Sequence, residues 1–190
     1  TQAARDIAHW QQDNAAVVPR VAVNVSATQM MDEGFAERAE RLVRAQGVAP
    51  GMIELEMTES ALMNEPEKAR LVASSLVEAG FCLSIDDFGT GYSSLAYLNR
   101  LPIDTIKLDR SFVVGLNLPV IRATVAMATS LGLGILAEGV EDEHELAALR
   151  AQGCHVFQGF LFSTPMTPEE VAAAGFGIRC KLGHYPLIGA

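Results

Sequence analysis

Polar and charged side chains stand at the ends of six short apolar runs in this sequence. In SIDDFGTGYSS, the apolar run 81–85 is followed by the adjacent carboxylates Asp86 and Asp87. Two neighbouring negative charges at the mouth of a buried strand repel, and partial burial strengthens the repulsion. The other run ends carry Asn24, Glu56 with Glu59, Lys107 with Asp109, Glu138, and Gln158. If these ends lie together, something must compensate their charge.

A shared site built from these residues would hold a surplus of negative charge. It would contain one ammonium group, Lys107, against the carboxylates Glu56, Asp86, Asp87 and Glu138. Oxygen ligands of this kind suit Mg²⁺ or Mn²⁺, and no cluster of His or Cys favours zinc. Two cations about 3.5–4 Å apart are a recurrent device for phosphodiester hydrolysis, because they activate water and stabilise the leaving oxygen. We therefore expect Asp86 and Asp87 to bind neighbouring metal ions.

Each of these residues also has a structural interpretation when it is taken alone. An Asp-Asp pair after a strand is often a helix cap or a solvated turn, and Asn24 fits a turn equally well. Lys107 on an apolar strand fits a structural ion pair as readily as a catalytic role. Their joint occurrence at successive strand ends is what favours a functional site.

The glycine-rich segment 88–94 follows the two acids and leads into a short helical stretch, 95–99. Such a loop can cradle a phosphate, although the signal is weak. The lysine of a P-loop is missing, so binding of a nucleoside triphosphate is not expected. We interpret the segment as a mobile loop that couples the metal site to a neighbouring subunit.

The elements that must position these residues alternate along the chain. Apolar runs typical of strands begin near Arg20, Met52, Phe81, Ile103, Leu133 and Cys154. Helical apolar spacing covers 35–46, 67–79, 120–131 and 143–152, and residues 1–13 also resemble a helix. Strands that alternate with helices indicate parallel pairing with right-handed crossovers.

Functional groups at every strand end favour a TIM-like (β/α)₈ barrel over an open sheet, which uses the ends of few strands. Six strands are visible, whereas a barrel needs eight and typically about 250 residues. We expect about six βα units in this chain and two further units before Thr1. The barrel is assigned to residues 1–175, and the tail 176–190 carries no recognisable motif.

Bulk properties narrow the function class. The chain has 190 residues and a formal net charge of −9, which argues against binding of a polymeric nucleic acid. No apolar run fits a membrane span or a signal peptide, so we expect a cytoplasmic domain without direct membrane contact, although it could belong to a longer, membrane-anchored protein. The cysteines Cys82, Cys154 and Cys180 lack CxxC spacing and indicate reduced thiols.

Six motifs give the chain a family resemblance over about residues 6–175: NVSATQ, ELEMTES, DDFGTGYSSL, IDTIKLDRSF, AEGVE and QGFLFSTP. In this order they resemble the EAL-domain family of cyclic di-GMP phosphodiesterases. The resemblance implies a barrel with one antiparallel strand and Mg²⁺- or Mn²⁺-dependent hydrolysis of cyclic di-GMP to linear 5'-pGpG. It also implies that a sensor or GGDEF domain could precede this one.

The resemblance implies roles at the metal site. Asn24, Glu56 and Asp86 look like metal ligands, and Asp87 resembles a ligand of a second metal ion or of its water. Glu138 resembles a further acid near the second ion, where it could act as the general base.

Further roles are implied around the metal site. Lys107 looks like the residue that orients or deprotonates the attacking water, and Glu59 like the anchor of the glycine-rich loop. Gln158, Ser26 and Gln29 resemble residues that line the ligand pocket. The loop is also implied to form a homodimer contact through Phe88, Gly89, Thr90, Gly91, Tyr92 and Ser93.

Departures from the family pattern leave alternatives open. The Glu-Ala-Leu signature is absent from this chain, the segment 113–119 is short, and Thr28 stands where many members have arginine. We expect the 190-residue chain, if made alone, to be inactive and poorly folded, because the signature glutamate and two strands are missing. The alternatives are a non-catalytic receptor for cyclic di-GMP and a barrel enzyme acting on glycerol phosphodiesters.

Overall fold

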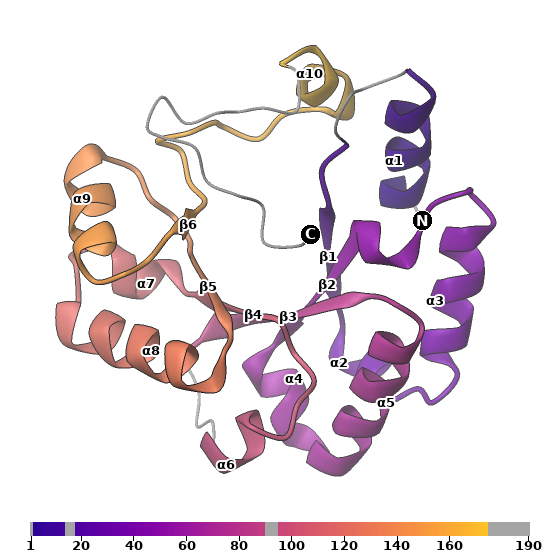
Figure 1. Cartoon of the computed structure of the whole chain (residues 1–190), viewed down its shortest axis with the longest axis horizontal. Helices are drawn as coiled ribbons and strands as arrows, with labels where there is room; N and C mark the ends of the chain where they lie inside the picture. The colour runs from indigo at the N-terminus through magenta and orange to yellow at the C-terminus, as the bar shows by residue number, and fades with distance from the viewer. Residues whose placement is uncertain (1, 14–17, 90–94, 175–190) are drawn as a thin grey trace.

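A computed structural model describes residues 2–13, 18–89 and 95–174 of the chain. Its described strands form one sheet in which neighbours are parallel and follow chain order (Figure 1). The six expected strands are confirmed as β1 (Val21–Val25), β2 (Ile53–Thr58), β3 (Cys82–Phe88), β4 (Thr105–Leu108), β5 (Gly134–Ala137) and β6 (Val156–Phe157).

Helices follow the strands much as the apolar spacing predicts. The long ones are α1 (Gln2–Gln12), α3 (Phe35–Arg44), α5 (Pro66–Glu78), α8 (Leu118–Leu131) and α9 (Glu143–Ala151). Short helices are α2 (Ala27–Met30), α4 (Glu59–Asn64), α6 (Leu95–Leu98), α7 (Arg110–Val113) and α10 (Pro168–Ala173), with a 3₁₀ turn at Pro50–Met52. Apart from α6, these short helices were not expected, because so few residues show no helical period; capping side chains such as Ser26 and Thr58 are their sequence signal.

The strand order decides between the two architectures that the sequence left open. The order runs from β1 to β6 without reversal, whereas a doubly wound sheet reverses at a switch point. Right-handed crossovers without reversal leave the helices on one side of the sheet, and Figure 1 shows them along its outer, convex side. The described chain is therefore part of a TIM-like barrel. The antiparallel strand of the family is not among the strands described.

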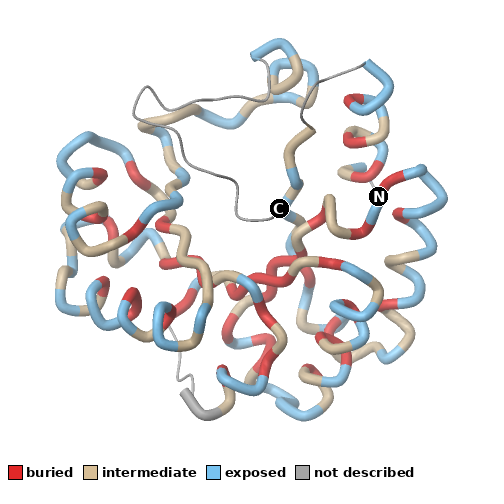
Figure 2. The backbone as a smooth tube through the Cα atoms, in the orientation of Figure 1, coloured by how far each residue is buried: buried red, intermediate tan, exposed pale blue. Residues whose placement is uncertain are grey.

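The two faces of the sheet differ in chemistry because side chains alternate along a strand. Side chains on the outer face, such as Leu55, Leu83 and Ile106, are buried in the main hydrophobic core. Residues on the opposite face include Glu56 and Lys107. Figure 2 shows the buried residues concentrated along the sheet and the inner sides of the helices. One face of the sheet stabilises the fold and the other carries polar groups.

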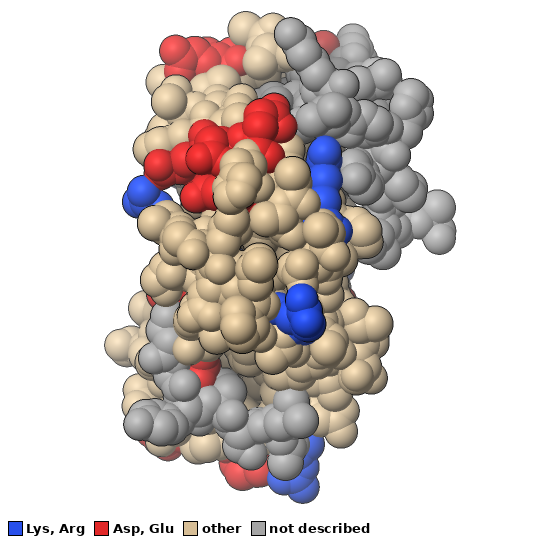
Figure 3. Space-filling view, turned by 90° about the vertical axis from the view of Figure 1, so that its left-hand side faces the viewer, with Lys and Arg blue, Asp and Glu red and all other residues tan. Residues whose placement is uncertain are grey.

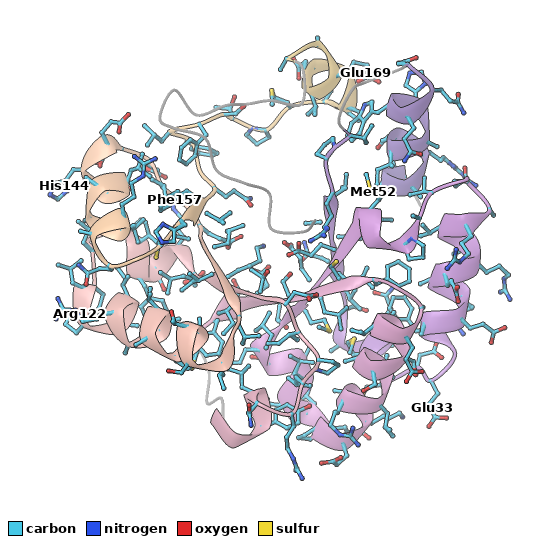
Figure 4. The ribbon with its side chains drawn as sticks, viewed as in Figure 1. Glu33, Met52, Arg122, His144, Phe157 and Glu169 are labelled. Carbon is cyan, nitrogen blue, oxygen red and sulfur yellow. The ribbon has the colours of Figure 1, made fainter. Side chains whose placement is uncertain are left out.

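The last described helix returns to the first. Val171 and Ala172 of α10 pack against the main core, which includes Ile7 and Trp10 of α1. Glu169 extends from α10 toward α1 and lies close enough to His9 of α1 for an electrostatic interaction (Figure 4). The segment after β6 thus crosses back to the N-terminal end of the described chain.

The surface over α9 is acidic. Asp142 caps this helix by accepting a hydrogen bond from the Glu145 N–H, and Glu143 lies in its first turn. Acidic side chains at a helix start interact favourably with the helix dipole. Figure 3 shows acidic residues gathered in the upper part of this face, while most of the face is uncharged and a few Lys and Arg side chains stand apart from them.

Two further expectations concern membranes and thiols. Within the described ranges, no helix combines the length and the apolar character needed to cross a membrane. Cys82 and Cys154 are free thiols, and burial raises the pKa of the Cys154 thiol to about 11. Cys180 lies outside the described residues.

Leu83→Ala should test how strongly the outer face of the sheet holds the fold. The Leu83 side chain is fully buried, so we expect its truncation to lower the free energy of unfolding by about 2–5 kcal/mol. Leu71→Ala is the matched control, because Leu71 is 56% exposed and should cost no more than about 0.5 kcal/mol. Urea denaturation of the full-length protein measures both free energies of unfolding. Equal losses in the two variants would contradict the assignment of the outer face to the core.

Candidate active site

Lys107 is the centre of a buried cluster of charges. Its ammonium nitrogen lies 2.7 Å from Glu56 Oε1, 2.7 Å from Glu138 Oε1 and 3.2 Å from Asp86 Oδ1. The Lys107 side chain is 5% exposed, and its three partners are 9–19% exposed. Charge-assisted hydrogen bonds in such a poorly hydrated place are strong. Four of the residues predicted from the sequence therefore meet.

The sheet register explains why these four side chains converge. Glu56 is the register partner of Ser84, and Ser84 is the partner of Thr105. Asp86 and Lys107 stand two residues farther along their strands, so they project from the same face as Ser84 and Thr105. Glu138 follows β5 directly and stands two residues beyond Leu136, the partner of Lys107. Period-two alternation thus aims all four at one place near the carboxyl ends of the strands.

Lys107 carries its proton firmly in this setting. Burial acts to lower the pKa of its ammonium group, but hydrogen bonds and charges from Glu138 and Glu56 outweigh that effect. The pKa therefore lies above its ordinary value. As the structure stands, Lys107 is a cationic hydrogen-bond donor, suited to orient a water or a phosphate oxygen rather than to remove a proton.

Glu138 has the opposite tendency. Burial raises the pKa of its carboxyl group, and the charges of Asp86 and Glu56 raise it further, against the lowering effect of Lys107. A carboxylate with a raised pKa is a better proton acceptor than an ordinary glutamate. Glu138 is therefore the member of the cluster best suited to general base chemistry.

Asp87 lies beside the cluster in a distinctive backbone conformation. Its φ of 54° is left-handed, and the pairing of β3 with β4 is irregular between Ile85 and Phe88. Burial, followed by the charge of Asp86, raises the pKa of Asp87. Asp109 accepts a hydrogen bond from the Asp87 carboxyl group, which has the raised pKa. Burial acts to raise the pKa of Asp109, but hydrogen bonds from Ser111, Arg110 and Asp87 bring it below its usual range. The bulge thus places Asp87 next to Asp109, at the edge of the Lys107 cluster.

Glu59 connects this strand end to the start of the glycine-rich loop. Its side chain is buried, and Oε2 accepts a hydrogen bond of 3.0 Å from the Gly89 N–H. Phe88 is buried beside it, whereas the predicted loop residues Thr90, Gly91, Tyr92 and Ser93 lie outside the described residues. The described contact fits the predicted anchoring role of Glu59.

The remaining predicted residues lie outside the Lys107 cluster. Asn24 is exposed on β1 as the register partner of Glu56. Ser26 and Gln29 form a reciprocal capping box at the start of α2, so their polar groups hold this helix. Gln158 is exposed after β6, and its backbone bonds to Ala137 and Val140. Their predicted ligand contacts stay predictions.

Sequence reasoning overlooked one buried member of the site. Ser84 is fully buried on the same strand face as Asp86, and its hydroxyl oxygen has no hydrogen-bond partner among the described residues. The sequence signal for Ser84 was the alternation of side chains along a strand, which places residues 84 and 86 on the same face. A serine within an apolar run reads as core, which is why it was missed.

The cluster offers a suitable donor set for a divalent cation. Within the described parts of the chain, no three His, Cys, Asp or Glu side chains form a ready metal-binding group, since the Lys107 ammonium lies between the acids. The ion pairs nevertheless use one oxygen of each carboxylate, and three carboxylates face one ammonium. Hard oxygen donors with surplus negative charge fit Mg²⁺ or Mn²⁺. The buried Ser84 hydroxyl, which has no hydrogen-bond partner among the described residues, is a further oxygen that could accept or donate a hydrogen bond there.

Comparisons with known proteins point to one family. The family model described as EAL domain matches residues 1–165. NbdA of Pseudomonas aeruginosa, named a cyclic di-GMP phosphodiesterase, is 43% identical over 152 residues, which cover 77% of this chain and 19% of NbdA. MucR of the same organism, named a bifunctional diguanylate cyclase/cyclic di-GMP phosphodiesterase, is 38% identical over 159 residues, which cover 81% of this chain and 23% of MucR.

Solved structures agree with these relatives. The MucR phosphodiesterase in complex with c-di-GMP superposes with a TM-score of 0.84 at 36% identity, covering 90% of this chain and 70% of that chain. Klebsiella pneumoniae BlrP1 with manganese and cyclic di-GMP gives a TM-score of 0.77 at 30% identity, covering 88% of this chain and 44% of BlrP1. The chain spans about a fifth of the length of the two curated relatives. The protein belongs to the EAL domain family.

Proposed function

We propose that this chain is the catalytic part of a metal-dependent phosphodiesterase that hydrolyses cyclic di-GMP to linear 5'-pGpG. The observation that carries the proposal is the convergence of Glu56, Asp86 and Glu138 on Lys107 at the carboxyl ends of the strands. Relatives at 38–43% identity bear names with this activity, and the MucR neighbour is a c-di-GMP complex. Family membership and site chemistry thus support the same reaction.

The proposed reaction adds water across one of the two phosphodiester bonds. The water oxygen bonds to phosphorus, the bond from phosphorus to the 3' oxygen breaks, and that oxygen takes up a proton. The product keeps a 5' phosphate, as linear 5'-pGpG requires. Divalent cations, when bound, lower the pKa of the attacking water and stabilise the charge of the leaving oxygen.

The protein's own residues would divide the remaining tasks. Glu56 and Asp86, with Asn24 and Asp87, would supply oxygen ligands for the cations. Lys107 would donate a hydrogen bond that orients the water, because its raised pKa keeps it protonated. Glu138 would accept the proton of the water, since burial raises its pKa. The manganese complex of BlrP1 supports the use of divalent metal ions.

The proposal extends to partners. Glu59 holds Gly89 at the start of the glycine-rich loop, which is the segment expected to contact a second copy of the chain. The printed name of MucR pairs a cyclase with a phosphodiesterase, which supports a linked GGDEF domain in the complete protein. Such a protein would act in the cytoplasm, with this domain clear of the membrane.

Hydrolysis of cyclic di-GMP by the full-length protein is the direct test. Chromatography should show conversion to 5'-pGpG in Mg²⁺ or Mn²⁺, and excess EDTA should abolish it. Readdition of the metal should restore it. Binding of cyclic di-GMP without any conversion would refute the enzyme and identify the protein as a receptor.

Lys107→Ala tests whether the Lys107 ammonium group takes part in turnover. We expect turnover to fall by about 10²-fold or more, because the water loses its positioned donor. Lys68→Ala is the matched control, since Lys68 lies on the outer helix α5, and it should turn over like the unaltered protein. Both are assayed at a temperature where circular dichroism shows them folded. Equal turnover in the two variants would remove Lys107 from the mechanism.

The metal site can also be tested without measuring turnover. In Lys107→Ala, the buried Glu56 and the partly buried Asp86 and Glu138 lose their ammonium partner, which should lower the melting temperature. A divalent cation that binds these acids should then raise the melting temperature of this variant more than that of Lys68→Ala. Thermal melts with and without MnCl₂ measure the difference. Identical shifts would speak against a metal site at these carboxylates.

A further inference from the structure

We infer that Arg110 and Glu141 form a strut that positions Glu138 and Asp109 at the rim of the site. The inference rests on the proposed function, because its main readout is turnover of cyclic di-GMP. Arg110 directly follows Asp109 at the end of β4, and Glu141 stands three residues after Glu138 at the end of β5. The guanidinium Nη2 lies 2.5 Å from Glu141 Oε1. One ion pair therefore joins the segments that carry two site acids.

The stem of Arg110 makes a second contact with the same turn. Gly139 adopts a left-handed φ of 69°, and a Cβ added there would overlap Arg110 Cγ and lie 2.7 Å from Arg110 Cδ. The aliphatic part of Arg110 thus lies directly on the backbone between Glu138 and Glu141. A glycine is needed at residue 139 for the conformation and for the close approach.

Other bonds hold the turn at its two ends. The Glu138 N–H donates to the Leu108 carbonyl at 3.1 Å, which ties Glu138 to β4. The Glu141 N–H donates to Glu145 Oε2 at 2.8 Å, which ties the far end to α9. Arg110, which follows β4, contacts the middle of the turn at Gly139 and its far end at Glu141. The backbone on both sides of Glu138 is thereby held, by β4 at one end and by α9 and Arg110 at the other.

The strut also bears on Asp109. Asp109 caps α7 through the Ser111 N–H, and Arg110 is the first residue of that helix. A guanidinium held by Glu141 therefore fixes the helix start that orients Asp109, which hydrogen-bonds to Asp87. One side chain sets the placement of acids on both strands.

The exposure of the Arg110 and Glu141 side chains indicates that their ion pair positions the neighbouring acids more than it stabilises the fold. The Arg110 and Glu141 side chains are 60% and 43% exposed, and exposed ion pairs add little to folding stability. Arg44 and Glu40 form a comparable pair at 2.8 Å, but within a single turn of α3. Arg110 and Glu141 are 31 residues apart in the chain. The Arg44 pair is therefore a suitable control.

Substitutions in the full-length protein test the ion pair. Arg110→Met keeps the stem and removes the charge, and Glu141→Gln removes the partner charge. Because displacements of about 1 Å can cost about 10²-fold in rate, we expect kcat to fall about 10- to 100-fold with little change in KM. Arg110→Lys should recover part of the loss. Arg44→Met and Glu40→Gln should leave kcat unchanged.

A glycine pair tests the stem contact. Gly139→Ala and Gly132→Ala impose similar backbone strain, since φ is 69° and 70°, but a Cβ at residue 132 meets nothing within 4 Å. Assayed at a temperature where circular dichroism shows both variants folded, Gly139→Ala should lose at least tenfold more kcat than Gly132→Ala. Equal kcat in the two variants would overturn the inference.

A spectroscopic readout distinguishes failure of the strut from failure of the proposed function. The NMR signal of the Lys107 ammonium, assigned by its loss in Lys107→Arg, senses the distance to Glu138 whether or not cyclic di-GMP is hydrolysed. It should shift in Arg110→Met and stay in place in Arg44→Met. An unaltered protein that cleaves no cyclic di-GMP would refute the function alone. An unshifted Lys107 signal in Arg110→Met would refute the strut.

Discussion

The pairing of one buried ammonium with three carboxylates is the constraint on which the site depends. Removing Lys107, Glu56, Asp86 and Glu138 from water is costly, and their mutual attraction offsets that cost only with close hydrogen-bonding geometry. Distances of 2.7–3.2 Å meet that condition. The strands that supply these residues cannot shift by one position, because a shift would send each side chain into the apolar layer.

The sheet supplies this geometry through its order and its two faces. Leu83 and Ile106 anchor β3 and β4 in the core under the helices, so the alternate residues of the same strands point to the polar face. Strand order without reversal keeps the described helices that connect the strands on the outer side and leaves the polar face uncovered by them. The apolar layer thus fixes where the charged residues stand.

Much of this arrangement could be predicted from sequence because it follows from periodicity. The six strands and their polar ends follow from short apolar runs that stop at polar residues, and the parallel pairing follows from the alternation of strands with helices. Tertiary contacts decided the rest: Lys107 lies between the acids rather than beside them, and Asp87 turns toward Asp109 at a bulge. Ser26 and Gln29, which are predicted to line the ligand pocket, also have the spacing of a capping box and form one, and their ligand contact stays a prediction.

The site carries more negative charge than the protein's own cationic groups neutralise. Lys107 offsets one of the three carboxylates around it, and Asp87 and Asp109 add more acid nearby. The whole chain carries a formal charge of −9, so a substrate with two phosphodiester charges would be repelled from this rim. Under the proposed function, a divalent cation would reverse the local sign where the acids converge and leave the rest of the surface acidic. The surplus of carboxylates is then the feature that would attract metal ions, and through them a small phosphodiester.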